Sequence, residues 1–176
     1  PALEFAARLK ENSLNPSHKD AIRTLTKLMK NPSYRAHRSE VYLALGQAHL
    51  AVRDSLRAEQ SFRACVDSAL GSPSSMAFAN LLLAELSLSR ELYPEALEHL
   101  RLSLPHLPPS HPRYDELTSL SASLTRLAPL ALTLRYQDSL VLHASSPEEC
   151  ATVQAQTAPV LLGMAQILYG ELGESK

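Results

Sequence analysis

Residues Val41 to Ser68 read VYLALGQAHLAVRDSLRAEQSFRACVDS, and this stretch decides the fold. It contains two segments with apolar residues at helical spacing, separated by a short polar break. A second stretch, Asn80 to Leu104, reads NLLLAELSLSRELYPEALEHLRLSL and repeats the arrangement. The two stretches align without a gap when Ala58 is set against Ala96.

The aligned positions extend along both stretches and define a period. They are Tyr42, Leu45, Gly46, His49, Ala58, Phe62 and Cys65 in the first stretch, and Asn80, Leu83, Ala84, Ser87, Ala96, Leu100 and Ser103 in the second. An upstream copy is visible as Ala21, Leu25 and Leu28, followed by Pro32. Ala21 and Ala58 are 37 residues apart, and Ala58 and Ala96 are 38 apart. A fixed period of this length is typical of stacked helical hairpins.

Small residues mark the places where paired helices are expected to approach closely. A side chain larger than alanine at Gly46 or Ala58 would push the helices apart. We therefore predict an all-α fold of stacked antiparallel hairpins with C-terminal capping helices, forming one domain. The hairpins are expected near 2–30, 38–69 and 75–104, within residues 1–108, and the capping helices within 109–176. An ordinary helical bundle with accidental periodicity is the alternative.

These residues resemble the tetratricopeptide repeat (TPR) family, whose first helix carries an aromatic, Leu-Gly and an aromatic, and whose second carries Ala, an aromatic and Ala. The first copy departs from this pattern at His49, and the second has Ala84 in place of the glycine. The second copy also contains the family-like phrase Leu92-Tyr93-Pro94-Glu95-Ala96-Leu97 and ends at Pro108. The resemblance covers about residues 2–108 and rests on packing positions.

The resemblance implies that the first helix of each hairpin lines a concave groove. The implied groove residues are Glu40, Leu43, Gln47, Leu50 and Ala51 in the first copy, and Phe78, Leu81, Glu85, Leu88 and Ser89 in the second. The family's receptors for chaperone tails use Lys, Asn and Arg there, and a glutamate at position 85 would repel a tail carboxylate. We expect instead that the apolar members bind an apolar helix or an extended segment of another protein. Filling by this chain's own C-terminal helix around Leu161 to Leu168, or simple packing between repeats, is the alternative.

A basic stripe is the second candidate site. Residues 1–40 contain eight Lys or Arg and four Asp or Glu, giving +4, and the remaining 136 residues carry −5. Four of these cations lie at helical spacing: Lys19, Arg23, Lys27 and Lys30. Such a stripe could bind an acidic protein or nucleic acid. The alternative is a solvated helix face without a partner. Nucleic acid is the weaker of the two, because no aromatic residues alternate with the charges to stack bases.

Composition narrows the class of protein. The chain has 176 residues, five glycines and no run approaching the roughly 20 apolar residues of a membrane span. The N-terminus shows no secretory signal, and Pro1-Ala2 suits either a native or a processed start. Cys65 and Cys150 show no paired spacing, and Cys65 is expected to be a buried thiol. The default expectation is an intracellular, cytoplasmic protein without membrane insertion, and an organellar location stays open.

The C-terminal third loses the repeat but keeps helical patterns. An apolar stripe ending at Leu127 is expected to stop or kink at Pro129, with another helix over Leu130 to Leu142. Ser146 followed by Pro147 predicts the start of a last helix, interrupted at Pro159 and ended by Gly173.

No catalytic or metal-binding motif was found. The chain has no glycine-rich phosphate loop and no His-Glu-x-x-His pattern. The sequence also places no histidine together with an acidic residue beside either cysteine, as a catalytic cysteine would require. His106 and His111 lie in a proline-rich connector without the other ligands that zinc needs. We therefore predict a non-enzymatic adaptor or scaffold subunit without cofactor or metal, with a nucleic-acid-associated subunit as the alternative.

Overall fold

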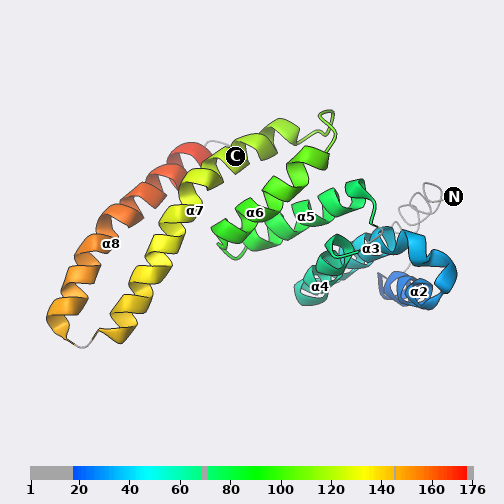
Figure 1. The fold of residues 1–176 in the computed structure, drawn as a ribbon, viewed down its shortest axis with the longest axis horizontal. Coiled ribbons are helices and arrows are strands. Elements are labelled where there is room, and N and C mark those ends of the chain that lie inside the picture. The colour runs from blue at the N-terminus through cyan, green and yellow to red at the C-terminus, as the bar shows by residue number, and fades with distance from the viewer. Residues whose placement is uncertain (1–17, 69–70, 145, 174–176) are drawn as a thin grey trace.

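The computed structural model describes residues 18–68, 71–144 and 146–173, and this part of the chain is all-helical. Seven α-helices follow one another along it, and each packs against the next (Figure 1). They are α2 (His18–Lys30), α3 (Arg38–Ala51), α4 (Ser55–Val66), α5 (Pro73–Leu88), α6 (Tyr93–Ser103), α7 (Tyr114–His143) and α8 (Pro147–Ile167). Shorter turns lie at η1 (Pro32–His37), η2 (Leu104–His106) and η3 (Leu168–Leu172). Residues 1–17, which contain the first half of the hairpin expected near 2–30, lie outside the described residues.

Three antiparallel pairs account for the closest helix packing: α3 with α4, α5 with α6, and α7 with α8. The first two pairs lie close to the predicted hairpins at 38–69 and 75–104. Figure 1 shows them as consecutive pairs between α2 at one end and the long α7–α8 pair at the other. The fold is thus helical throughout its described part, with neighbours along the chain packed together as neighbours in space.

The turns inside the first two pairs are copies of one another. Arg53 has φ 60° and Glu91 has φ 58°, and these residues are 38 positions apart. In each turn a backbone N–H reaches back five residues: Asp54 donates to the His49 carbonyl and Leu92 to the Ser87 carbonyl, both at 2.9 Å. The period found in the sequence is therefore also a period of the backbone.

A glycine at position 53 should stabilise the protein. The left-handed conformation costs a non-glycine residue about 1 kcal/mol or more, and glycine avoids that cost. We expect Arg53→Gly to raise the free energy of unfolding by about 0.5 kcal/mol, after the greater entropy of the unfolded glycine is subtracted. Denaturant melts would measure the change. Arg57→Gly, inside α4, is the matched control and should destabilise; if both variants lose stability, the turn is not left-handed at Arg53.

Two apolar cores run through the array. One lies within and between the first two pairs and includes Ala58, Phe62, Cys65, Ala79 and Leu83. The other joins α5, α6, α7 and the end of α8; it includes Leu81, Leu97, Leu100, Leu124 and Ile167. Cys65 is fully buried as expected, and burial raises the pKa of its thiol to about 12.

Two of the expected helix breaks are wrong. α7 runs through Pro129 as a single helix of 30 residues, and α8 runs through Pro159. Proline removes a backbone hydrogen bond to the carbonyl four residues earlier, here Thr125 and Ala155. Both prolines and both of those residues are exposed, so water can satisfy the freed carbonyls. Ser146 caps α8 as predicted, because its Oγ accepts a hydrogen bond from the Glu149 N–H at 3.2 Å.

α8 does not lie in the expected groove, where one of the alternatives from the sequence placed it. This helix packs along α7 at the far end of the array, rather than in the region between α3 and α5 (Figure 1). The expected groove is therefore not filled by the segment Leu161 to Leu168. Within the described residues, no helix combines the length and apolar character needed to cross a membrane.

Candidate functional site

The groove residues predicted on α3 lie at one turn spacing along the helix. Positions 43, 47 and 50 share a face, since residues three and four apart are neighbours on a helix surface. Leu43 and Leu50 are half-buried and pack against the core around Phe62, while Gln47 is exposed. α3 also contacts α5 directly, so the first helices of the two hairpins are side by side. Among these three predicted groove residues on α3, Gln47 is the one most exposed to solvent.

The groove residues on α5 are more enclosed. Leu81 has only 6% of its surface exposed and belongs to the core that contains Leu97 and Leu100. Phe78 and Leu88 are half-buried against the same core. The apolar members on α3 and on α5 therefore pack into different cores, and no single open stripe joins them.

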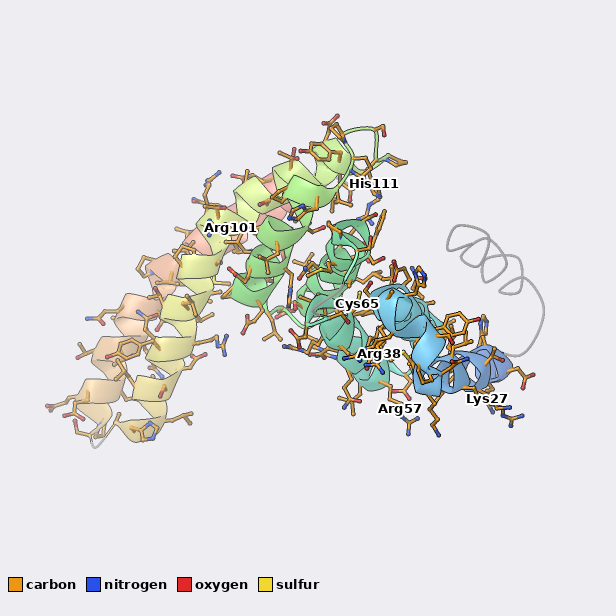
Figure 2. The ribbon with its side chains drawn as sticks, turned by 45° about the vertical axis from the view of Figure 1, so that its right-hand side comes forward. Lys27, Arg38, Arg57, Cys65, Arg101 and His111 are labelled. Carbon is orange, nitrogen blue, oxygen red and sulfur yellow. The ribbon has the colours of Figure 1, made fainter. Side chains whose placement is uncertain are left out.

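The connector before α7 folds over this part of α5. The His111 ring lies against Phe78, with ring centroids 5.9 Å apart, and the connector's position beside α5 is visible in Figure 2. Arg113 Nη1 lies 2.6 Å from Glu85 Oε1, and the same guanidinium pairs with Glu116 at 3.1 Å. The hydrogen bond from Arg113 is the main reason that the pKa of Glu116 is lowered. Glu85 and Phe78 are thus partly occupied by contacts within the chain.

Two histidines sit inside the hairpins. His49 is 8% exposed, at the position where the tetratricopeptide pattern has an aromatic. His99 Nδ1 lies 3.0 Å from Asn80 Oδ1, and the Asn80 amide donates to the Met76 carbonyl. Because Asn80 Oδ1 accepts, the Nδ1 of His99 carries the hydrogen. Burial lowers the pKa of both histidines, since it disfavours the charged ring.

These histidines predict an acid-sensitive fold. When a histidine's folded pKa is below its unfolded value of about 6.5, the unfolded chain binds protons first as the pH falls. Their contribution to stability is therefore full above that value and is lost on acidification. We expect the free energy of unfolding to decrease between about pH 7 and pH 5, and the double variant His49→Gln with His99→Gln to show a shallower decrease. An unchanged slope would assign the acid sensitivity to other groups.

The predicted basic stripe lies on one helix, α2. Lys19, Arg23, Lys27 and Lys30 are all exposed, and Leu25 on the opposite side is buried. Lys27 points away from the neighbouring helices in Figure 2. Arg23 lies 3.9 Å from Asp20, a distance at which an exposed pair contributes little. The stripe is therefore a solvated cationic face at one end of the described array.

Two arginines outside the basic stripe, Arg35 and Arg38, also contribute to the positive charge of residues 1–40. Arg35 and Arg38 line a hollow of about 540 Å³ between η1, the start of α3 and the end of α4. Asp67 lines the same hollow and offsets part of their charge. The other lining residues are Ser39, Tyr42, Ala64 and Ser68. The sequence showed the local excess of charge, but only the fold brings position 67 to positions 35 and 38.

Comparison with known proteins leaves the family open. No family model matches the chain, and no curated protein is similar enough to count as a relative. The resemblance to the tetratricopeptide family therefore stays a prediction. It rests on the repeated residues, together with the turn that recurs at Arg53 and Glu91.

Proposed function

We propose that this chain is a non-enzymatic helical-repeat adaptor or scaffold subunit that binds another protein through the exposed face of α3. The observation that carries the proposal is the side-by-side placement of α3 and α5, with Gln47 exposed between the half-buried Leu43 and Leu50. A polar group flanked by two partly covered leucines suits an amphipathic partner: the leucines supply apolar contact and the amide fixes register.

The partner best suited to this face is a short apolar helix or extended segment. On α5, the connector already contacts Phe78 and Glu85, so the accessible part of the groove is centred on α3. Glu85 pairs with Arg113 of the same chain, so this side chain is already engaged by a contact within the chain. The expected site is thus narrower than the groove implied by the resemblance.

A charge at Gln47 tests the proposal with little risk to the fold. Gln47→Arg places a cation on the α3 face, and Gln60→Arg makes the same change at an exposed position of α4. We expect affinity purification with mass spectrometry to recover a protein with the wild type and with Gln60→Arg, and to lose it with Gln47→Arg. If every protein recovered by the wild type is also recovered by Gln47→Arg, the contact lies elsewhere.

A second candidate function uses the basic face of α2. Its four exposed cations support a nucleic-acid-associated subunit, because phosphate contacts come mainly from Lys and Arg. The test is binding of labelled single-stranded RNA over a range of salt concentrations. Contact with several phosphates gives a steep loss of affinity with salt, and Lys27→Glu should reduce both the affinity and the slope. Undetectable binding at low salt would eliminate this candidate.

A further inference from the structure

The hollow lined by Arg35 and Arg38 holds donors that have no partner among the described residues. Both arginines are exposed, and neither forms an ion pair or a side-chain hydrogen bond with that part of the chain. The hydroxyl of Tyr42 lines the same hollow and also lacks a described hydrogen-bond partner. Guanidinium and hydroxyl groups bind phosphate oxygens well. The hollow therefore has the chemistry of an anion site, and its volume of about 540 Å³ leaves room for a phosphate group.

A carboxylate in the wall limits which anions this site can hold. Asp67 lines the hollow and repels an anion that enters from solution. Exposed arginines also bind a free ion weakly, because water and salt screen their charge. A phosphate that is already attached to the chain beside the hollow overcomes both effects, since its effective concentration there is high. The site is thus suited to a tethered phosphate rather than to a free one.

Ser72 is placed to carry such a phosphate. Its backbone N–H donates to Ser39 Oγ at 3.1 Å, and Ser39 lines the hollow directly after Arg38. Ser72 is half-buried, has extended backbone with φ −66° and ψ 127°, and comes immediately before Pro73 at the start of α5. An extended Ser-Pro pair at the end of a loop is the kind of segment that proline-directed kinases modify. Its position at the N-terminus of α5 also favours negative charge.

We infer that Ser72 is a phosphorylation site and that Arg35 and Arg38 bind its phosphate. The kinase transfers the γ-phosphoryl group of ATP: the bond from the serine oxygen to phosphorus forms, the bond to the β-phosphate oxygen breaks, and the hydroxyl proton passes to the kinase's base. The two serines that line the hollow are less suitable. Ser39 is 1% exposed, and Ser68 lies just past the C-terminal end of α4, where the helix dipole disfavours a phosphate.

Treatment of the full chain with a proline-directed kinase and ATP tests the modification itself. We expect fragment spectra of the tryptic peptides to place a phosphate on Ser72, and Ser72→Ala to remove that signal. A folded wild-type chain that gains no phosphate at Ser72 overturns the inference.

Phosphoserine incorporated at position 72 during translation tests the two arginines independently of any kinase. The Tm of the phosphorylated and unmodified chains is compared in the wild type and in a background with Arg35→Ala and Arg38→Ala together. We expect the phosphate to raise the Tm by about 2–4 °C in the wild type, and by less than half as much in the alanine background. Each rise is measured within one background, so any loss of stability from the alanines cancels. An equal rise in both would assign the effect to the dipole of α5 alone and overturn the inference.

Ser146 provides the matched control. It is also a Ser-Pro serine that caps a helix, but Glu148 and Glu149 follow it in place of arginines. Titration by phosphorus NMR compares the pKa of a phosphoserine at the two positions. We expect the lower pKa at Ser72, because the arginines favour the dianion there and the glutamates disfavour it at Ser146. A phosphate at Ser72 that titrates at or above the pKa of the one at Ser146 is not bound by the arginines, and this result would overturn the inference.

Discussion

Gly46→Leu is expected to destabilise the protein by about 3 kcal/mol, because the position has no space for a side chain. A Cβ added to Gly46 would lie closer than 3.0 Å to the Phe62 ring. That ring is fully buried between α3, α4 and α5, so it cannot move aside without disturbing the core. For a chain of this size, a loss of about 3 kcal/mol lowers the Tm by roughly 6–12 °C.

The size of the substituent and its position provide the controls. Gly46→Ala introduces the same Cβ with no further atoms, and we expect a loss of about 1 kcal/mol. In α8 an added Cβ at Gly163 would meet only the tip of Leu130, at an ordinary contact distance of 3.4 Å. Gly163→Ala should therefore be neutral or stabilising, since alanine favours a helix by up to about 1 kcal/mol over glycine. A Gly46→Leu protein that melts with the wild type would mean that α3 and α4 do not meet at this glycine.

The sequence predicted the helix pairs near 38–69 and 75–104 because their determinants are local and repeated. Small residues at Gly46 and Ala58 with a large one at Phe62 specify one close helix crossing, and the period places the next crossing 38 residues later. The two left-handed turns were not predicted. Neither Arg53 nor Glu91 is a glycine, so the usual sequence marker for that conformation was absent.

The C-terminal third was harder to predict because its outcome depends on which side of a helix faces water. A helix was expected to stop or kink at Pro129 and another to be interrupted at Pro159, but α7 and α8 continue through these prolines, and each proline lies on an exposed side. Two apolar side chains of this region, Leu132 and Leu162, are more than half exposed. Sequence spacing shows that residues share a face, but it does not show whether a neighbouring helix covers that face.

The same limit applies to the candidate groove. Spacing placed Leu81 on one face with Phe78 and Leu88, and the resemblance implied that this face was concave and open. Only the fold shows that Leu81 points into the core shared with α6, and that the connector reaches Phe78 through His111. The contact between His111 and Phe78 joins positions 33 residues apart, so no local pattern could have indicated it.

Leu81→Asp is expected to remove most of the protein's stability rather than to act on a partner alone. Leu81 is 6% exposed and packs in the core that contains Leu97 and Leu100. The substitution loses the buried leucine and places a carboxylate where no cation is available within that apolar cluster, for a combined cost of about 4 kcal/mol or more. Such a loss approaches the total stability of a typical domain, roughly 5–15 kcal/mol.

Gln47→Asp is the matched control for this substitution. It introduces the same carboxylate at an exposed member of the same predicted groove, and it should change the free energy of unfolding by less than about 0.5 kcal/mol. Urea melts followed by circular dichroism would compare the two variants. If Leu81→Asp melts with the wild type while Gln47→Asp does not, then α5 presents Leu81 to solvent and α3 is the covered helix. The groove would then be centred on α5, and the arginine substitution that tests for a partner should be moved there from Gln47.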